Sequence, residues 1–345
     1  MIKTSDTNQA SASNKNIFKF AVFIIIAFLI ILKIWFVMSD FLGFGGNDNN
    51  IYIEIPQNAS ISEIEEILYE NNIIDQKIAF RLYAKGRYSA FQYGGHIVNT
   101  SMSYSKICES LSSVGVSKKV NLVIPEGYEL SMIADACEKA GITNAKDFIN
   151  SADNDNFNYS FIKDVSGTKH RLEGFLFPAT YEFDYKTDAY VVIDTMLKTF
   201  EQIYTSDFSK RAKEIGMSDY EIITLASIIE REAGNVSEQK KIAGVFYNRL
   251  KKNMRLQSCA TVQYILEERK DILSIKDTEI DSPYNTYKYE GLPIGPVASP
   301  GLSSIEAALY PDNTEYYYFA AKPDGSGNIF SKTYEEHQEA VAKNR

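Results

Sequence analysis

The longest apolar run in the chain is IFKFAVFIIIAFLIILKIWFVM, residues 17–38. It follows a polar tail, residues 1–16, and has about the 20 residues that a helix needs to cross the hydrocarbon layer of a membrane. Lys19 and Lys33 lie near its ends, and Trp35 suits the membrane interface. The run is long for a signal peptide and no small-x-small cleavage signal follows it, so the pattern favours a single transmembrane helix.

Charge on either side of this run predicts its orientation. Lys3, Lys15 and Lys19 precede most of it, whereas Asp40 and Asp48 follow it. Because positive residues stay on the cytoplasmic side, we expect a cytoplasmic N-terminus and an extracytoplasmic remainder. Residues 39–50, which contain FLGFGGNDNN, have the Gly and Asn content of a flexible linker.

Residues 51–142 contain a weak repeat of one pattern: an alternating strand, a proline, a polar turn and an amphipathic helix. The copies are IYIEIPQNASISEIEEILYENNII (51–74) and VNLVIPEGYELSMIADACEKAGI (120–142). The matched pairs are Pro56 with Pro125, Ser62 with Ser131 as expected N-caps, and Ile64 with Ile133. Convergence on a common local pattern explains the repeat equally well. The second copy resembles the first half of a LysM module, a small βααβ unit that binds glycans containing N-acetylglucosamine.

The pattern of residues 143–345 predicts a domain of mixed helices and strands. We therefore expect an α+β fold with one N-terminal transmembrane helix. Helices are expected at 188–204, from Ser218 with a Ser218/Glu221 capping box, and from Ser237. The segment 282–301 is a loop rich in Pro, Gly and Tyr, and the C-terminus predicts a hairpin around the turn PDGSGN, followed by a polar helix.

One carboxylate stands out in the helix expected from Asp219 to Ala233. Ile222, Leu225, Ala226 and Ile229 form the apolar stripe of a buried face, and Glu230 lies at its margin. A carboxyl group that borders apolar surface favours its protonated form, which suits an acid catalyst. Glu232 lies roughly 200° further round the helix, so the two carboxylates should not face one ligand together. We expect Arg231 and Glu232 to be solvated charges.

Composition narrows the class of ligand. With 36 Lys and Arg against 45 Asp and Glu, the net charge of −9 argues against a nucleic acid partner. His96, His170 and His337 stand singly, with no Cys, His or carboxylate at metal-ligand spacing, so we expect no metal site. Cys108 and Cys137 are expected as buried thiols, and a disulfide between them stays possible.

Four ordered motifs carry a resemblance to a known family: LEGFLFPATYEF, LASIIEREAG, KKIAGVFYNRLKKNMRLQSCATVQY and SPYNTYKYEGLPIGPVASPG. Together they look like the membrane-anchored endolytic murein transglycosylase (YceG-like) family, and the likeness covers most of residues 17–345. The resemblance implies that Glu230 is the catalytic acid of residues 143–345. It also implies a glycan cleft, whose expected contacts are Gln257, Thr261, Tyr264, Tyr284, Asn285, Thr286 and Tyr287. Cys259-Ala260 stands where many relatives have Asp-Pro, so the role of that Asp is in doubt here.

The resemblance implies a lytic transglycosylase at the bacterial cell membrane, which needs neither a metal nor an organic cofactor. It would cut the β-1,4 bond between N-acetylmuramic acid and N-acetylglucosamine in nascent peptidoglycan strands and leave 1,6-anhydro ends, which limits glycan elongation. Its partners would be the glycan strand, the membrane and peptidoglycan synthases of elongation or division. Two alternatives stay open: a hydrolytic muramidase with a second acid such as Glu173, and a non-enzymatic scaffold that binds peptidoglycan.

Overall fold

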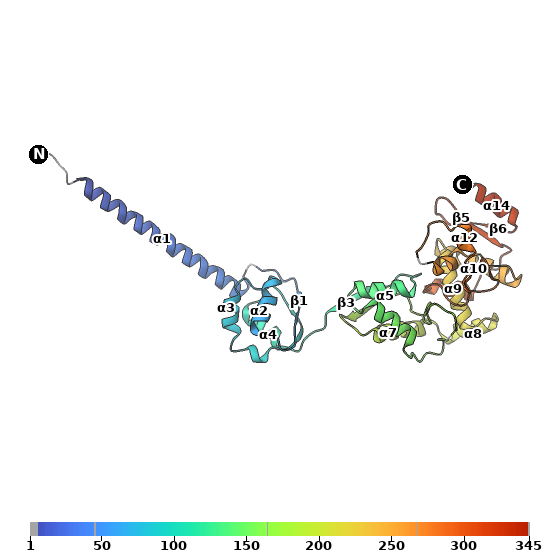
Figure 1. Ribbon diagram of the computed structural model, residues 1–345, viewed down its shortest axis with the longest axis horizontal. Helices are drawn as coiled ribbons and strands as arrows, with labels where there is room; N and C mark the ends of the chain where they lie inside the picture. The colour runs from blue at the N-terminus through green and yellow to red at the C-terminus, as the bar shows by residue number, and fades with distance from the viewer. Residues whose placement is uncertain (1–5, 45, 164, 267, 344–345) are drawn as a thin grey trace. The chain divides into compact units, whose positions relative to one another are not determined.

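The computed structural model describes residues 6–44, 46–163, 165–266 and 268–343. The chain divides into two compact units, Met1–Lys118 and Lys119–Arg345, each with its own hydrophobic core (Figure 1).

The N-terminal unit is a long helix followed by a small β-α-α-β-α arrangement. Its elements are α1 (Asp6–Leu42), β1 (Ile51–Ile55), α2 (Ile61–Glu70), α3 (Lys77–Ala84), η1 (Tyr88–Ala90), β2 (Gly94–Val98) and α4 (Tyr104–Ser112). Strands β1 and β2 pair antiparallel, and the alternation of β1 turns Ile53 and Ile55 into the core while Glu54 faces solvent. Helix α2 begins at the capping box formed by Ser60 and Glu63, two residues before the Ser62 expected as the cap.

Helix α1 confirms the predicted apolar helix. Within the described residues it is the one helix long and apolar enough to cross a membrane, over Lys19–Leu42 with a mean hydropathy of 2.9. Its C-terminal end is tied to the small unit, because Asp40 accepts hydrogen bonds from the backbone N–H groups of Asp75 (3.0 Å) and Gln76 (2.8 Å) and from the hydroxyl of Tyr104. The ring of Phe41 packs on Tyr83 and Tyr104.

The segment 39–50, expected as a linker, makes specific contacts. Helix α1 continues to Leu42, and the backbone N–H of Asn47 donates to Thr100 Oγ1 at 2.9 Å. The hydroxyl of Ser101 bonds the carboxylate of Asp48. A Cβ atom at Gly43 would lie 2.3 Å from Ser101 O and one at Gly46 would lie 2.0 Å from Thr100 O, so these glycines allow a close approach to the turn after β2.

The C-terminal unit contains helices around two further strand pairs. Its elements are β3 (Lys119–Val123), α5 (Leu130–Lys139), α6 (Ala145–Asn154), β4 (Thr180–Asp184), α7 (Ala189–Ile203), α8 (Ser206–Glu214), α9 (Asp219–Glu232), η2 (Val236–Glu238), α10 (Gln239–Lys251), α11 (Cys259–Ile265), α12 (Ile275–Thr278), α13 (Leu302–Leu309), β5 (Tyr318–Ala321), β6 (Asn328–Ser331) and α14 (Tyr334–Lys343).

The two copies of the sequence repeat fall in different units. Both fold as a strand, a turn and a helix, β1–α2 and β3–α5, but β3 pairs antiparallel with β4, whose Asp184 lies opposite Lys119. That long-range pairing draws residues 119–142 into the C-terminal unit, so the domain boundary expected between residues 142 and 143 lies inside it. The N-cap of α5 is Glu129, and Ser131 lies within its first turn rather than at the cap.

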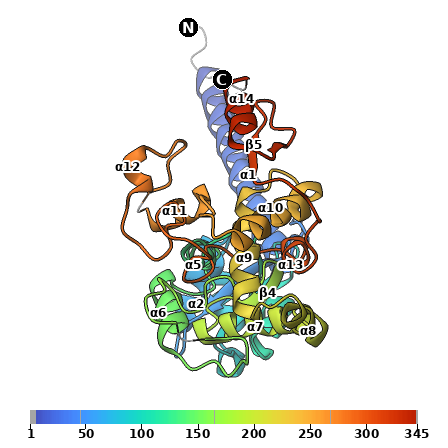
Figure 2. The same cartoon turned by 90° about the vertical axis from the view of Figure 1, so that its right-hand side faces the viewer.

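Helix α9 runs through the middle of the C-terminal unit, with α10, α11 and α13 against it (Figure 2). The expected C-terminal hairpin and polar helix are confirmed as the antiparallel pair β5–β6 and α14. Cys108 and Cys137 are free thiols, as expected, and burial raises the pKa of Cys137 to about 12. The fold is therefore a mixed α/β structure with one apolar N-terminal helix.

Candidate active site

Helix α9 positions Glu230 at the point where a buried helix reaches the surface. The helix begins at the predicted capping box of Ser218 and Glu221 and ends with Ala233 as its C-cap. Every residue from Ile222 to Ile229 is buried, including the predicted apolar stripe, and Glu230 is the first partly exposed residue after them. The helix is fixed by packing on all sides, so the position of the Glu230 backbone is fixed as well.

Two segments remote in sequence meet at Glu230. Its Oε2 accepts a hydrogen bond of 3.0 Å from the backbone N–H of Gly301, the N-cap residue of α13. Glu126, in the loop between β3 and α5, also lies against Gly301, because a Cβ atom added to that glycine would be only 2.0 Å from Glu126 Oε1. Partial burial, and then the negative charge of Glu230, raise the pKa of Glu126. The site therefore brings two carboxyl groups to one glycine.

Backbone hydrogen bonds hold these two segments together. Gly127 N–H donates to Ser299 O and Ser299 N–H donates to Tyr128 O, both at 2.8 Å. Arg231 Nη1 donates to Gly127 O at 3.1 Å, which joins the end of α9 to the same loop. Gly127 has φ +77°, a conformation that favours glycine. The loop that carries Glu126 is therefore anchored on two sides.

Arg231 and Glu232 are not the solvated charges expected from the sequence. Both side chains are partly buried, Arg231 on the Gly127 carbonyl and Glu232 at the start of α11. Glu232 Oε1 accepts hydrogen bonds from the hydroxyl of Ser258 and from Ala260 N–H at 3.3 Å. Burial raises the pKa of Glu232, although these hydrogen bonds oppose the shift. Other segments surround the end of α9, so no face of its last turn is fully solvated.

Most of the predicted glycan contacts are buried. These are Thr261, Tyr264, Tyr284, Asn285 and Thr286, none more than 3% exposed. Their polar atoms bind the protein itself: Thr261 Oγ1 lies 2.9 Å from Thr286 Oγ1, and Asn285 Nδ2 donates to the carbonyls of Thr278 (3.0 Å) and Ile280 (2.8 Å). In this structure the five side chains hold the segment 256–287 together and offer no exposed face on which a sugar could stack.

Gln257 and Tyr287 do retain exposed surface, and both line a cavity of about 340 Å³. The cavity lies between the segment around α11 and the C-terminal hairpin, where Glu232, Arg249, Cys259, Tyr318 and His337 also line it. Cys259 Sγ lies 3.1 Å from the hydroxyl of Tyr287, and burial raises the pKa of this thiol. The structure thus places two of the predicted contact residues together at a cavity.

Glu173, the alternative second acid, is buried and 2% exposed. Leu130 N–H donates to both of its oxygens, at 3.1 and 3.2 Å, and the Tyr264 hydroxyl donates to Oε2 at 3.0 Å. Burial raises the pKa of Glu173 to about 8, although the Leu130 hydrogen bond opposes the shift. Both oxygens are occupied inside the protein, so Glu173 supports α5 and Tyr264 and is not available to a ligand.

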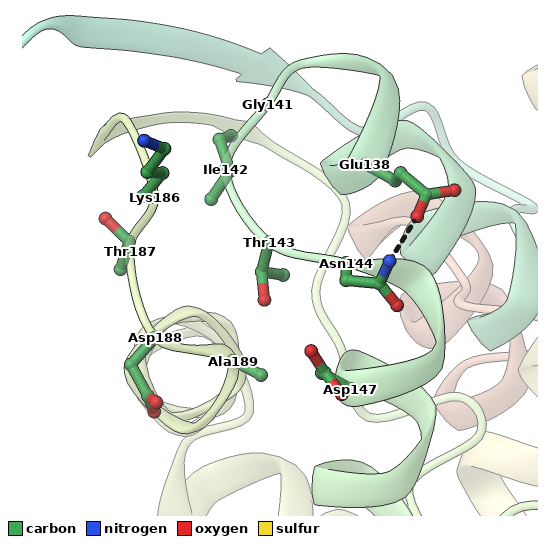
Figure 3. Close-up of a pocket in the computed structure, with 10 residues that line it drawn as sticks. All are labelled: Glu138, Gly141, Ile142, Thr143, Asn144, Asp147, Lys186, Thr187, Asp188 and Ala189. Carbon is green, nitrogen blue, oxygen red and sulfur yellow. Dashed lines mark hydrogen bonds between the residues drawn. The ribbon is translucent and has the colours of Figure 1, made fainter.

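Another cavity, of about 460 Å³, lies between the α5–α6 connection and the turn before α7 (Figure 3). Figure 3 shows Lys186 and Thr187 on one side and Thr143 and Asp147 on the other, and Asn144 donates to Glu138 Oε1 at 2.8 Å. Its lining residues come from 138–147 and 186–189, not from the segments that carry Glu230. We therefore place the candidate site at Glu230.

Glu126 is the member of the site that sequence reasoning missed. Its signal is present in the sequence, since it directly follows Pro125 in the turn of the second repeat copy, where the first copy has Gln57. A turn position alone predicts a solvated side chain. Only the folded structure shows that Glu126 lies against Gly301.

Comparison with known proteins identifies the class. Residues 53–343 match the YceG-like family, and the chain belongs to this family. A protein of Bacillus subtilis (strain 168) named endolytic murein transglycosylase is 40% identical over 305 residues, which covers 85% of this chain and 84% of that protein. A protein of the same name from Streptococcus pneumoniae serotype 2 is 30% identical over 338 residues, covering 89% of this chain and 61% of the relative. The crystal structure of a yceG-like protein from Listeria monocytogenes is 37% identical and aligns with a TM-score of 0.60 over 85% of this chain and all of that chain.

Proposed function

We propose that the protein is an endolytic peptidoglycan lytic transglycosylase with Glu230 as its catalytic acid. It cleaves the β-1,4 bond between N-acetylmuramic acid and N-acetylglucosamine within nascent strands and leaves 1,6-anhydro ends, which limits glycan elongation. The observation that carries the proposal is the partly exposed Glu230 at the end of an otherwise buried helix, in a chain that is similar over most of its length to proteins named endolytic murein transglycosylases.

The proposed reaction needs one carboxyl group that gives and regains a proton. Glu230 protonates the bridging oxygen as its bond to C1 of the muramic sugar breaks, and the electron pair of that bond stays on the oxygen. The C6 hydroxyl of the same sugar then bonds to C1 and its proton returns to the Glu230 carboxylate. No water enters, so the product has an anhydro end.

The contact with Gly301 suits this double role. The N–H of Gly301 holds Oε2 and leaves Oε1 as the oxygen that we assign to the reacting proton. The same N–H lies at the N-terminus of α13, where a negative charge is stabilised by about 0.3 to 1 kcal/mol. This contact supports the carboxylate that exists between the two proton transfers.

A hydrolytic muramidase is the second candidate, and a specific observation favours it over the scaffold alternative. Ordinary glycosidases use two carboxyl groups across the scissile bond. Glu173 is a poor second acid because it is buried, whereas Glu126 lies beside Glu230. Hydrolysis would leave a reducing end that contains one more water than the anhydro end, so the mass of the product separates the two.

The finer parts of the proposal concern binding. We assign direct glycan contacts to Gln257 and Tyr287, which border the 340 Å³ cavity, and a supporting role to the five buried residues of the segment 256–287. Both β1–α2–α3–β2 and β3–α5–α6–β4 have the β-α-α-β order and an antiparallel pair, which supports a LysM-like, glycan-binding origin for each.

The apolar part of α1 supports a single-pass anchor in the bacterial cell membrane. The lysines before the span and the aspartates after it favour a cytoplasmic N-terminus and an extracytoplasmic site. At that location the enzyme would meet nascent strands beside the peptidoglycan synthases of elongation or division.

Digestion of nascent glycan by the full-length protein and by Glu230→Gln tests the proposal. Gln keeps the size of Glu but carries no transferable acid proton, so strand shortening should fall by a factor of about 10² to 10⁴. Glu306→Gln is the matched control, because Glu306 is an exposed residue of α13 outside the site. Full activity in Glu230→Gln would refute the assigned acid, and a wild-type protein that shortens no strands would favour the scaffold.

A further inference from the structure

Arg249 is a buried cation whose hydrogen-bond partners are all carbonyl groups. It belongs to α10, is 7% exposed, and lines the cavity of about 340 Å³ beside the C-terminal hairpin. Its Nε donates to Tyr317 O at 2.6 Å, and its Nη1 donates to Leu256 O at 2.7 Å and to Arg255 O at 3.3 Å. In the part of the chain that the structure describes, it forms no ion pair with a carboxylate. Buried charges in proteins are normally paired, so this one lacks the usual counterion.

Glu232 carries the one carboxyl group among the described residues that line the cavity. Its Oε1 accepts hydrogen bonds from the hydroxyl of Ser258 and the N–H of Ala260, not from Arg249. Burial raises the pKa of Glu232, and the charge of Arg249 opposes that shift less than the hydrogen bonds do. The acid within the protein therefore compensates Arg249 only weakly.

Three other titratable groups of the cavity lining are held in neutral forms. Burial raises the pKa of the Cys259 thiol and of the Tyr287 hydroxyl. Burial, and then the charge of Arg249, lower the pKa of His337. The His337 ring stacks on Tyr318 with 5.3 Å between centroids, and the Arg249 guanidinium lies 5.1 Å from the same Tyr318 ring. At neutral pH the cavity therefore presents a positive charge beside aromatic and amide surface.

The backbone of Gln257 gives a second indication of a binding site. Gln257 is exposed at this cavity and has φ +47°, a left-handed conformation that is uncommon for a residue other than glycine. Its N–H donates to Thr286 O at 3.0 Å, which fixes that conformation. Backbone strain of this kind is concentrated at functional sites. On Arg249, Nη2 is the nitrogen that these carbonyl groups do not engage, so it is the donor that we assign to a ligand.

This inference rests on the proposed cleavage of peptidoglycan strands, because it names the part of the substrate that the cavity holds. The muramic sugars of nascent strands carry short stem peptides, whose carboxyl groups are ionised at neutral pH. We propose that the 340 Å³ cavity is a subsite for a carboxylate of the stem peptide, which pairs with Arg249. A guanidinium and a carboxylate form strong and directional hydrogen bonds. The subsite orients the strand and takes no part in breaking the glycosidic bond.

Cleavage kinetics of the full-length wild type on three forms of uncrosslinked strand test the subsite. The first form keeps its stem peptides, and the second has their carboxyl groups converted to neutral methylamides. The third has lost its stems and keeps only the lactyl carboxylate of the muramic sugar. Because hydrogen bonds to charged groups are the strong ones, KM should rise roughly 10-fold on the second and third forms while kcat changes little. A KM on either form equal to that on the first would overturn the stem carboxylate as the ligand.

Arg249→Gln tests whether the preference arises at this cavity. Gln keeps N–H donors for the carbonyl groups but carries no charge, so the variant should cleave charged and neutralised strands with the same KM. The ratio of the two KM values does not depend on the folded fraction, since both are measured on one preparation. Arg249→Lys keeps the charge and should retain part of the ratio. The matched control Lys240→Gln removes an exposed positive charge of α10 and should retain all of it. A ratio near 10 in Arg249→Gln overturns the role of Arg249.

A second variant decides if Arg249→Gln does not fold by circular dichroism. Gln257→Glu changes an exposed side chain and adds a negative charge at the cavity, which repels the stem carboxylate and should lower the ratio roughly 3-fold or more. An unchanged ratio there overturns the subsite. The proposed function fails in a different way: Glu230→Gln would then cleave all three forms, whereas failure of the subsite leaves cleavage by the wild type intact and removes only the preference for charged stems.

Discussion

The side chain of Glu173 shows how strongly burial changes the chemistry of a carboxyl group. It is 2% exposed, and burial raises its pKa from 4.5 to about 8. Glu126, in a loop, and Glu230, at the end of a helix, differ from Glu173 because both keep contact with solvent. A raised pKa is therefore a poor guide to the catalytic residue here, and accessibility to a ligand separates the structural acid from the candidate acid.

The pH dependence of stability should report Glu173. Below about pH 4.5 the group is protonated in both the folded and the unfolded state and contributes no pH dependence. As the pH rises toward about 8, the unfolded state ionises and the folded state does not, so this group lowers the free energy of unfolding by up to about 1.4 kcal/mol per pH unit.

The neutral variant Glu173→Gln removes that slope. Its free energy of unfolding relative to the wild type should rise steadily between about pH 5 and pH 8, as measured by urea titration with circular dichroism. Parallel curves for the two proteins would show that Glu173 is already ionised in the folded state. Glu306→Gln, which changes an exposed carboxyl group, should run parallel to the wild type.

At the scale of elements, Glu232 joins α9 to α11. It accepts hydrogen bonds from Ser258 and Ala260 at the start of α11, a short helix of seven residues whose N-cap, Ser258, makes no side-chain capping bond. Glu232→Ala should lower the free energy of unfolding by about 1 to 2 kcal/mol, because it removes an N-terminal acceptor. Activity should fall far less than in Glu230→Gln.

The matched variant Ser258→Ala removes one of these two contacts and should cause a smaller loss in the same denaturation experiment. If Glu232→Ala were as inactive as Glu230→Gln while its stability stayed unchanged, Glu232 would have a chemical role that this account does not give it.

The sequence predicts elements well where the signal is local. Helix α9 follows from its apolar period and the Ser218/Glu221 capping box, and the C-terminal hairpin follows from its turn. The pairing of β3 with β4 and the meeting of Glu126 with Gly301 join segments about 60 and 175 residues apart, and no local pattern encodes such contacts. The place of Glu230 at the end of a buried helix was predictable from the local pattern, whereas its role as the acid comes from the resemblance of the surrounding motifs and stays a proposal. Glu126 and the buried role of Asn285 were not predictable, because both depend on what the rest of the chain packs against them.

At the scale of the whole molecule, truncation can separate the proposed membrane role of α1 from its packing in the N-terminal unit. Its apolar segment is long enough to cross a membrane, and its last residues, Asp40 and Phe41, pack into the N-terminal unit. A chain that starts at Val37 should lose membrane association and keep the stability of that unit. A chain that starts at Ile51 should lose both, because the carboxylate that binds Tyr104 and the backbone of Gln76 is then absent.

Vesicle flotation measures the association and limited proteolysis measures the stability of the unit, with the full-length chain as the control. Flotation of the Val37 chain at the level of the full-length protein would place the membrane contact outside α1. Equal protease resistance of the two truncated chains would show that Asp40 and Phe41 do not stabilise the unit.

The central claim is that Glu230 cleaves glycan strands without consuming water. Mass spectrometry of the ends formed when the full-length protein digests nascent peptidoglycan tests it most directly, with Glu230→Gln as the inactive reference. The account predicts 1,6-anhydro-N-acetylmuramic ends, one water lighter than reducing ends, with wild type and none above background with the variant. Reducing ends from the wild type, or anhydro ends from Glu230→Gln, would contradict it.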